Sequence, residues 1–206
     1  MITFRKTKEK YGGLSNMASG YGFNLQGINF LTSEALYQAM RYPNHPEFQK
    51  AIIIQKSPMT AKMISKKYKE HTRSDWELIR IMVMRWCIRI KLIKNWDKFG
   101  SLLLETSDKV IVEESRKDDF WGAKSSDQNL LVGTNALGRL LMELRSELPN
   151  FIGDSILIPP KIENLEILGK SIQVLNFNNI ELPKQKIVKL DQYENLSLFD
   201  NERNNK

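Results

Sequence analysis

The chain has very few of the residues that bind metals or form disulfides. Its 206 residues include one cysteine, Cys87, and two histidines, His45 and His71. A single cysteine excludes an intramolecular disulfide, which fits a reducing compartment. Zinc sites need several His or Cys ligands at short spacings, and these three residues lack such spacing. We therefore expect no bound metal, and we expect Cys87 to be a core residue.

Long hydrophobic runs and the common nucleotide-binding glycine motifs are also missing. No apolar stretch approaches the ~20 residues of a membrane span, and residues 1–10 are polar where a secretory signal would turn apolar. Neither GxxxxGKS/T nor GxGxxG after a strand occurs. We predict a cytoplasmic protein without a membrane segment, in which carboxylates are the remaining candidates for acid–base chemistry.

The positive charge is concentrated in the first three quarters of the chain. Residues 1–150 contain 24 Lys and Arg against 16 Asp and Glu, whereas residues 151–206 contain 7 against 8. A basic domain attracts the phosphates of nucleotides or nucleic acids. A solvated basic surface would show the same excess, so charge alone leaves both interpretations open.

Periodicity and capping signals predict a mostly helical domain with short strands. The turn-forming Gln26-Gly27 between alternating apolar residues predicts a hairpin over 23–30. Hydroxyl caps, proline positions and apolar stripes predict helices, and β-branched residues predict a strand. The predicted helices are 32–42, 57–69, 74–93 (opened by a Ser74/Glu77 capping box), 95–104 and 135–148, and the predicted strand is 109–113.

Two carboxylates beside aromatic residues are the candidates for catalysis. Asp118 and Asp119 precede Phe120-Trp121-Gly122 just after the predicted strand, and Glu34 lies in the first turn of a predicted helix. Carboxylates at a strand's exit suit the rim of a pocket, and Trp121 offers a flat face for stacking a base. A solvated turn, a core tryptophan and a Glu that complements the helix dipole would account for the same residues.

These segments, taken in order, resemble the NADAR family, also called YbiA-like. The resemblance covers about residues 4–148, and its strength lies in the order of the segments rather than in any one of them. The matching segments are Leu14-Ser15-Asn16, Thr32-Ser33-Glu34 with Tyr37-Gln38-Ala39, Ser57-Pro58 with Ala61-Lys62, Arg73 with Asp75-Trp76, Val83-Met84, Leu103-Leu104 with Thr106 and Asp108, Val112-Glu113, Asp118 with Phe120-Trp121-Gly122, and Gly133 with Asn135, Leu137-Gly138, Leu141-Met142 and Arg145. Ser107 and Lys124 stand where the family often has glycine, which leaves the substrate details at those loops open.

The resemblance implies a compact, predominantly helical α+β domain with a few short strands. It places a catalytic domain at residues 1–148 and leaves 149–206 as a C-terminal extension that packs on the domain or is partly flexible. It implies an N-glycosidase, which cleaves a bond between a ribose carbon and a nitrogen without a cofactor or metal. The oligomeric state stays open.

The resemblance also implies roles for particular residues. Glu34 would stabilise or attack the ribosyl cation, and Asp118 would transfer a proton, although these two roles are exchangeable. Lys62 and Arg73 would meet phosphate, Arg73 through two hydrogen bonds. Lys62 equally fits a solvated helix face, and Arg73 and Trp76 equally fit the start of the central helix. The substrate-binding residues predicted in this way are Asn16, Tyr37, Lys62, Arg73, Trp76, Trp121, Gly122 and Asn135.

Three functions remain in competition at this point. The first is an ADP-ribosyl hydrolase that removes ADP-ribose from modified guanine bases, with ADP-ribosylated DNA or RNA as candidate partners. The second is an N-glycosidase of phosphorylated riboflavin-biosynthesis intermediates. The third is a non-catalytic module that binds ADP-ribose or NAD. The presence of both Glu34 and Asp118 favours an enzyme, because a binding module has no ribosyl cation to stabilise.

Overall fold

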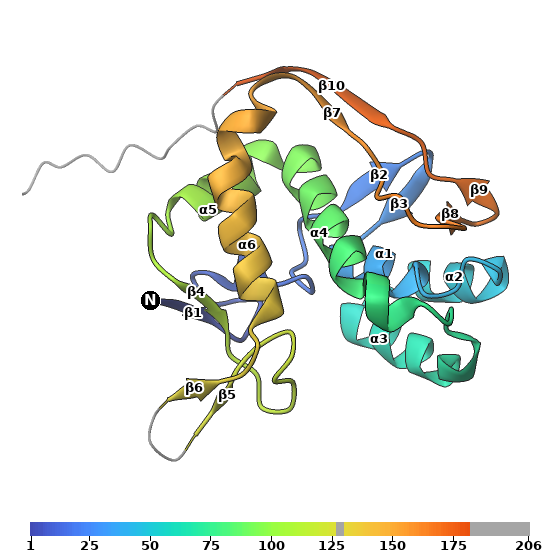
Figure 1. Ribbon diagram of the computed structural model, residues 1–206, viewed down its shortest axis with the longest axis horizontal. Coiled ribbons are helices and arrows are strands. Elements are labelled where there is room, and N and C mark those ends of the chain that lie inside the picture. Colours follow the sequence, from blue (N-terminus) through green and yellow to red (C-terminus); the bar gives the residue numbers. More distant parts are fainter. Residues whose placement is uncertain (127–129, 182–206) are drawn as a thin grey trace, which may run out of the picture.

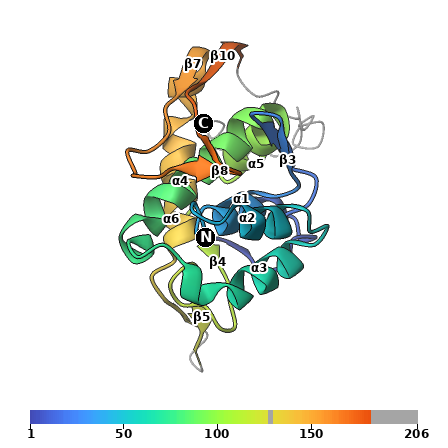
Figure 2. The same cartoon turned by 90° about the vertical axis from the view of Figure 1, so that its right-hand side faces the viewer.

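A computed structural model describes residues 1–126 and 130–181, which form an α+β domain in which helices predominate (Figures 1 and 2). The α-helices are α1 (Ser33–Ala39), α2 (Pro46–Ile53), α3 (Pro58–Lys67), α4 (Trp76–Lys94), α5 (Ser101–Leu104) and α6 (Ala136–Glu147). Shorter helical turns are η1 (Gly12–Leu14), η2 (Lys69–His71), η3 (Trp96–Gly100, a π-helix) and η4 (Leu148–Phe151). The strands are β1 (Ile2–Phe4), β2 (Phe23–Leu25), β3 (Ile28–Phe30), β4 (Ile111–Glu113), β5 (Lys124–Ser125), β6 (Leu131–Val132), β7 (Gly153–Leu157), β8 (Glu166–Ile167), β9 (Lys170–Ser171) and β10 (Leu175–Ile180).

Helix α4 runs through the centre of the domain (Figure 1). It packs against α1 on one side and against α6 on another. The apolar residues predicted to form its inner face are buried, except that Met82 is 38% exposed; they are Ile79, Met82, Val83, Trp86, Ile90 and Ile93. Cys87 on this helix is fully buried, as expected for a core residue. None of the described helices is long and apolar enough to cross a membrane.

The start of α4 differs from the prediction. Ser74 does not cap the helix; the N-cap is Asp75, and its side chain makes no capping hydrogen bond. Arg73 instead binds the Asp75 carboxylate through Nε and Nη2, at 2.6 and 3.0 Å. Glu77 pairs with Arg80 at 3.0 Å. The predicted capping box is therefore wrong, because the N-cap is Asp75 rather than Ser74 and the Glu77 carboxylate that would have completed the box pairs with Arg80.

Other helix boundaries also differ from the predicted ones. The helix predicted over 57–69 ends at Lys67, and the segment 95–104 is a π-helical turn followed by the short α5. Helix α2, whose first residue is Pro46, has no counterpart among the predicted elements. The hairpin of β2 and β3 is confirmed, with positive φ at Gln26 and Gly27.

The described strands pair two by two rather than forming one sheet. The β1–β4 pair is parallel, with Phe4 opposite Glu113, and it ties the amino terminus to the segment that precedes the aspartate pair. Parallel pairing needs a long crossover, which here contains helices α1 to α5. This pair fixes one wall of the pocket described below.

Beyond residue 148 the described chain packs on the same core. Strands β7 and β10 form an antiparallel ribbon that arches over one end of α4 and α6 (Figure 1). The β8–β9 turn is held at α2, where Gln49 donates to the Glu166 carbonyl and accepts from the Leu168 amide. Ile167 is fully buried. The division at residue 148 stays a prediction, and residues 182–206 of the extension lie outside the described residues.

Candidate active site

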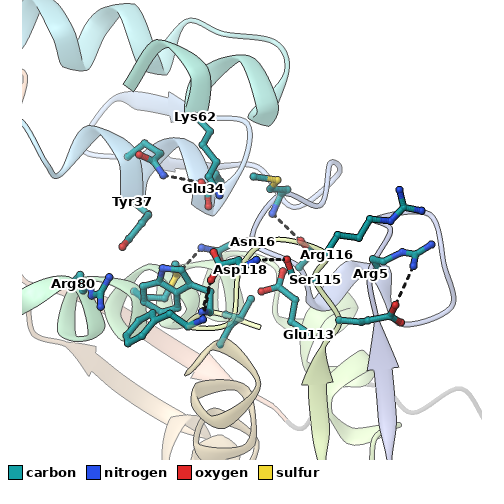
Figure 3. A pocket seen from close by; sticks show the side chains of 18 of the residues that line it. Arg5, Asn16, Glu34, Tyr37, Lys62, Arg80, Glu113, Ser115, Arg116 and Asp118 are labelled. Atoms are coloured by element: carbon teal, nitrogen blue, oxygen red, sulfur yellow. Dashed lines mark hydrogen bonds and ion pairs between the residues drawn. The ribbon is translucent and has the colours of Figure 1, made fainter. Parts of the chain in front are cut away.

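A cavity of about 630 Å³ is lined by residues of helices α1, α3 and α4 and of the segment from Glu113 to Trp121 (Figure 3). This volume is within the range of pockets that bind small molecules. Of the ten predicted site residues, those at its wall are Asn16, Glu34, Tyr37, Lys62, Trp76, Asp118 and Trp121. The fold thus brings segments from five parts of the chain to one place.

Glu34 is a buried carboxylate in the first turn of α1. Thr32 caps this helix through its side-chain oxygen, which accepts from the Ala35 amide at 3.3 Å. The carboxylate of Glu34 accepts from Gln38 Nε2 at 2.9 Å, and Gln38 in turn accepts from Ser65 Oγ at 2.7 Å. This chain of hydrogen bonds fixes the carboxylate in the pocket wall and supplies it with one donor.

Asn16 reaches the pocket from a loop that a buried lysine holds. Lys91 Nζ donates to the carbonyl oxygens of Gly13 and Ser15, at 2.6 and 2.9 Å. Burial lowers the pKa of Lys91 well below its ordinary value. The Asn16 side-chain oxygen accepts from Ser33 Oγ at 2.8 Å. The loop is thereby attached to both α4 and the start of α1, beside Glu34.

Asp118 sits in a tight turn that its own side chain closes. Its Oδ1 accepts from the backbone amides of Phe120 and Trp121, at 3.1 and 2.8 Å. Among the described residues, no hydrogen bond reaches its other oxygen, Oδ2. Asp119 is exposed and pairs with Lys124, outside the pocket. The structure therefore places Asp118 at the pocket wall and Asp119 outside it.

Glu113 is a third carboxylate at the pocket, and no role was predicted for it from its sequence context. It ends β4, and its carboxyl group lies near Asp118 (Figure 3). Burial raises the pKa of Glu113 to about 7, and the charges of Glu34 and Asp118 add to the rise while Lys62 opposes it. The sequence did contain a signal for this residue. Glu113 is the last residue of the predicted strand 109–113, and it was the end of that strand that made Asp118 a candidate.

The raised pKa of Glu113 predicts a pH-dependent stability. In the unfolded chain this group ionises near 4.5, and in the folded chain near 7. The folded chain therefore holds the Glu113 proton more tightly than the unfolded chain does. The resulting contribution to the free energy of unfolding is complete below about pH 4.5 and is lost as the pH rises through 7. We expect Glu113→Gln to stabilise the protein by about 2 kcal/mol at about pH 8 and by little at about pH 4. Urea unfolding at both pH values measures this, and an equal effect at both would contradict it.

Aromatic side chains form one end of the pocket. The Tyr37 ring lies 5.0 Å from Trp76 and 5.6 Å from Trp121, measured between centroids, and it meets Trp121 edge-on. Phe120 extends this wall, with the Arg80 guanidinium 3.7 Å from its ring centre. Burial, followed by the charge of Glu34, raises the pKa of Tyr37, so its hydroxyl stays a hydrogen-bond donor. A planar base can stack against such a wall.

Cationic side chains surround the rest of the pocket. Arg5 and Arg116 lie together beyond Glu113, Lys62 lies above Glu34, and Arg80 lies beside the aromatic wall (Figure 3). Arg5 pairs with Glu114 and Arg80 with Glu77. Among the described residues, Lys62 and Arg116 make no ion pair. The positive excess of the sequence therefore includes cationic groups at the pocket wall.

Three predicted site residues do not line the pocket. The Arg73 guanidinium is taken by Asp75 and by the carbonyls of Glu163 and Asn164, so it attaches the C-terminal segment to α4. Asn135 binds the backbone of β4 through both ends of its amide. Gly122 lies against the same strand, where a side chain would overlap the Glu113 carbonyl. Asn135 and Gly122 therefore hold the wall that carries Glu113.

The acids at the pocket do not have the arrangement of a metal site. Over residues 1–126 and 130–181, no group of three or more His, Cys, Asp or Glu side chains could hold a metal ion. The chemistry that the arrangement supports is acid–base catalysis and stabilisation of a positive charge, between an aromatic wall and a ring of cations.

The sequence and the fold are similar to known proteins. The sequence profile of the NADAR domain matches residues 3–149. The N-glycosidase YbiA of Escherichia coli strain K12 is 32% identical over 148 residues, which cover 72% of this chain and 88% of that protein. A riboflavin biosynthesis protein of Vibrio vulnificus is 33% identical over 147 residues, covering 71% of this chain and 38% of that protein. The solution NMR structure of E. coli YbiA has a TM-score of 0.62 at 31% identity and covers 73% of this chain and 85% of its own.

Proposed function

The chain belongs to the NADAR domain family and is an N-glycosidase, and from this premise we propose that it removes ADP-ribose from modified guanine bases. The observation that carries the proposal is the pocket itself. Glu34, Glu113 and Asp118 meet there, between an aromatic wall and cationic side chains. Such a site suits a planar base, a ribose that becomes positively charged, and phosphates.

Two carboxylates of the pocket have different roles in the proposed reaction. Breaking the bond between C1′ of ribose and a nitrogen builds positive charge on the sugar, as in the oxocarbenium state of other glycosidases. Glu34, fixed by Gln38, stabilises this charge or attacks C1′. Asp118, through its Oδ2, takes a proton from the attacking water or gives one to the leaving nitrogen. The result is a free base and a sugar that carries a hydroxyl group at C1′.

The distribution of charge favours a substrate with more than one phosphate. Lys62 stands over Glu34, whereas Arg5 and Arg116 lie on the far side of Glu113 (Figure 3). A diphosphate that joins two ribose groups could reach such separated cations. Each guanidinium group can bind two oxygens of one phosphate at the same time. The aromatic wall at Tyr37 and Trp121 would then stack the guanine.

A riboflavin-pathway substrate is the second candidate. The observation in its favour is the match to a riboflavin biosynthesis protein, of which this chain spans 38%. A phosphorylated ribosylamino-pyrimidine has the same C1′–N bond and a flat ring. It carries fewer phosphates, so it would leave part of the cationic rim without a partner.

A panel of substrates distinguishes these functions. The protein is incubated with DNA carrying ADP-ribosylated guanine, with phosphorylated ribosylamino-pyrimidines and with NAD, and released base and sugar are measured by mass spectrometry. Release from the DNA supports the proposal, whereas release from the pyrimidines alone supports the second candidate. Tight binding without release from any of them would show a non-catalytic binding module.

Asp118 provides a direct test of the site. In Asp118→Asn the remaining side-chain oxygen can still accept from the amides of Phe120 and Trp121, so the turn is retained while the charge is lost. We expect kcat to fall about 100-fold. The matched control is Asp119→Asn, one residue away and outside the pocket, which should keep the wild-type rate. Equal rates for the two variants would remove Asp118 from the mechanism.

A further inference from the structure

The Glu113 carboxyl group differs from its two neighbours in its hydrogen bonding. Glu34 accepts from the Gln38 amide, and Asp118 accepts from two backbone amides. No hydrogen bond or ion pair to the Glu113 side chain occurs among the described residues. Donors favour the charged form of a carboxyl group, so the group without donors is the one that retains a proton when three crowd together.

The backbone around Glu113 is held firmly. Its amide donates to Asn135 Oδ1 at 3.1 Å, and its carbonyl accepts from the Ala123 amide at 2.8 Å. It also lies opposite Phe4 in the β1–β4 pair. A backbone anchored on three sides fixes where the Glu113 side chain enters the pocket, which proton transfer to a bound substrate requires.

Charged groups face Glu113 from each element that surrounds it. Glu34 on α1 and Asp118 in the following loop are negative, and Lys62 on α3 is positive. Arg5, Lys6, Glu114 and Arg116 line the same pocket beside β1 and β4, and Glu77 and Arg80 line it from α4. Burial, followed by the charges of Glu34 and Asp118, outweighs the opposing charge of Lys62. The pKa of Glu113 is therefore raised to about 7. A group that titrates near neutral pH is suited to donate a proton under those conditions.

From this arrangement, and resting on the proposed N-glycosidase function, we propose that Glu113 is the acid that protonates the leaving nitrogen. The C1′–N bond breaks with its electron pair going to the nitrogen, which takes the proton from Glu113. Water then adds to C1′ and gives up a proton to Asp118, which leaves a hydroxyl group on the sugar. The Asp118 proton returns to Glu113 through solvent, so the sum is hydrolysis with the enzyme unchanged.

The test compares pH profiles of kcat/KM for the wild type, Glu113→Gln, Glu113→Asp and the control Glu70→Gln, which is exposed and outside the pocket. Each is assayed with whichever substrate the wild type cleaves. Because the protonated form is required, wild-type kcat/KM should fall as the pH rises above about 7. Glu113→Gln should lower kcat/KM about 100- to 10,000-fold at about pH 6 and abolish this fall, and Glu113→Asp should retain a fall. Glu70→Gln should match the wild type.

A second measurement does not depend on turnover. In protein labelled with carbon-13 at glutamate carboxyl groups, NMR should show one resonance that titrates near pH 7 and is missing from Glu113→Gln. The proposal is overturned if that resonance titrates in the ordinary glutamate range. It is also overturned if Glu113→Gln keeps the wild-type rate and pH profile, in which case the N-glycosidase function still stands. A wild type that cleaves no substrate in the panel refutes the proposed function itself.

Discussion

Replacing Glu34 with glutamine is expected to lower kcat about 1,000-fold, which corresponds to about 4 kcal/mol in the barrier. The positive charge on the ribose exists only in the transition state, so a carboxylate that faces it affects kcat more than substrate affinity. Glutamine has the same shape and can still accept from Gln38 Nε2, so the hydrogen-bond chain to Ser65 is retained. Steady-state kinetics with the cleaved substrate measures the loss.

The matched control for this change is Glu47→Gln. Glu47 lies in the first turn of α2 as Glu34 lies in the first turn of α1, but it is exposed and away from the pocket. If Glu34 merely complemented its helix dipole, both variants would lose less than about 1 kcal/mol of stability and neither would lose activity. A Glu34→Gln enzyme with the wild-type kcat would exclude Glu34 from the chemistry.

Replacing Gly138 with alanine is expected to destabilise the fold by about 3 kcal/mol. In an exposed helix interior this change usually stabilises by about 1 kcal/mol. Here α6 lies so close to β4 that the added methyl group would overlap the Ile111 carbonyl oxygen and the Asn135 side chain. Those two groups are hydrogen-bonded to each other and hold the strand that ends at Glu113. Chemical denaturation measures the change in unfolding free energy.

Arg139→Ala is the control for Gly138→Ala. Arg139 is the next residue on α6 and is exposed, so its replacement should change stability by less than about 0.5 kcal/mol. We also expect Gly138→Ala to lower activity, because β4 carries Glu113 at its end. If Gly138→Ala were as stable as the wild type, the contact between α6 and β4 would be looser than the structure indicates.

Local patterns were enough to predict much of the fold. Thr32 and Ser57 each cap a helix through their side-chain oxygens, as their positions in the sequence indicate. The hairpin at Gln26-Gly27 was predicted from its turn chemistry. Helix α2 was missed even though it begins at Pro46, and the capping box at Ser74 was wrong because Asp75 is the N-cap and the Glu77 carboxylate pairs with Arg80. These errors depend on which of several local hydrogen bonds forms.

Seven of the ten residues predicted from the order of the family segments lie at the pocket wall, but that order could not show the hydrogen-bond partners of each polar side chain. Arg73 was expected to meet phosphate, yet it binds carbonyls about ninety residues further along the chain. Asn135 was expected to meet the substrate, yet β4 takes both ends of its amide. Arg5 and Arg116 could not be predicted, because only the pairing of β1 with β4 brings their segments to one rim. Long-range pairing of this kind leaves no local signal.

Hydrolysis in water enriched in oxygen-18 tests most directly whether this pocket breaks a C1′–N bond. The substrate is the compound in the panel that the wild type cleaves, and mass spectrometry follows both products. We predict that the base is released unlabelled, that the C1′ hydroxyl of the sugar carries one oxygen-18, and that Glu34→Gln nearly abolishes both. A protein that binds all of these substrates without releasing a base, or a release that Glu34→Gln does not change, would contradict it.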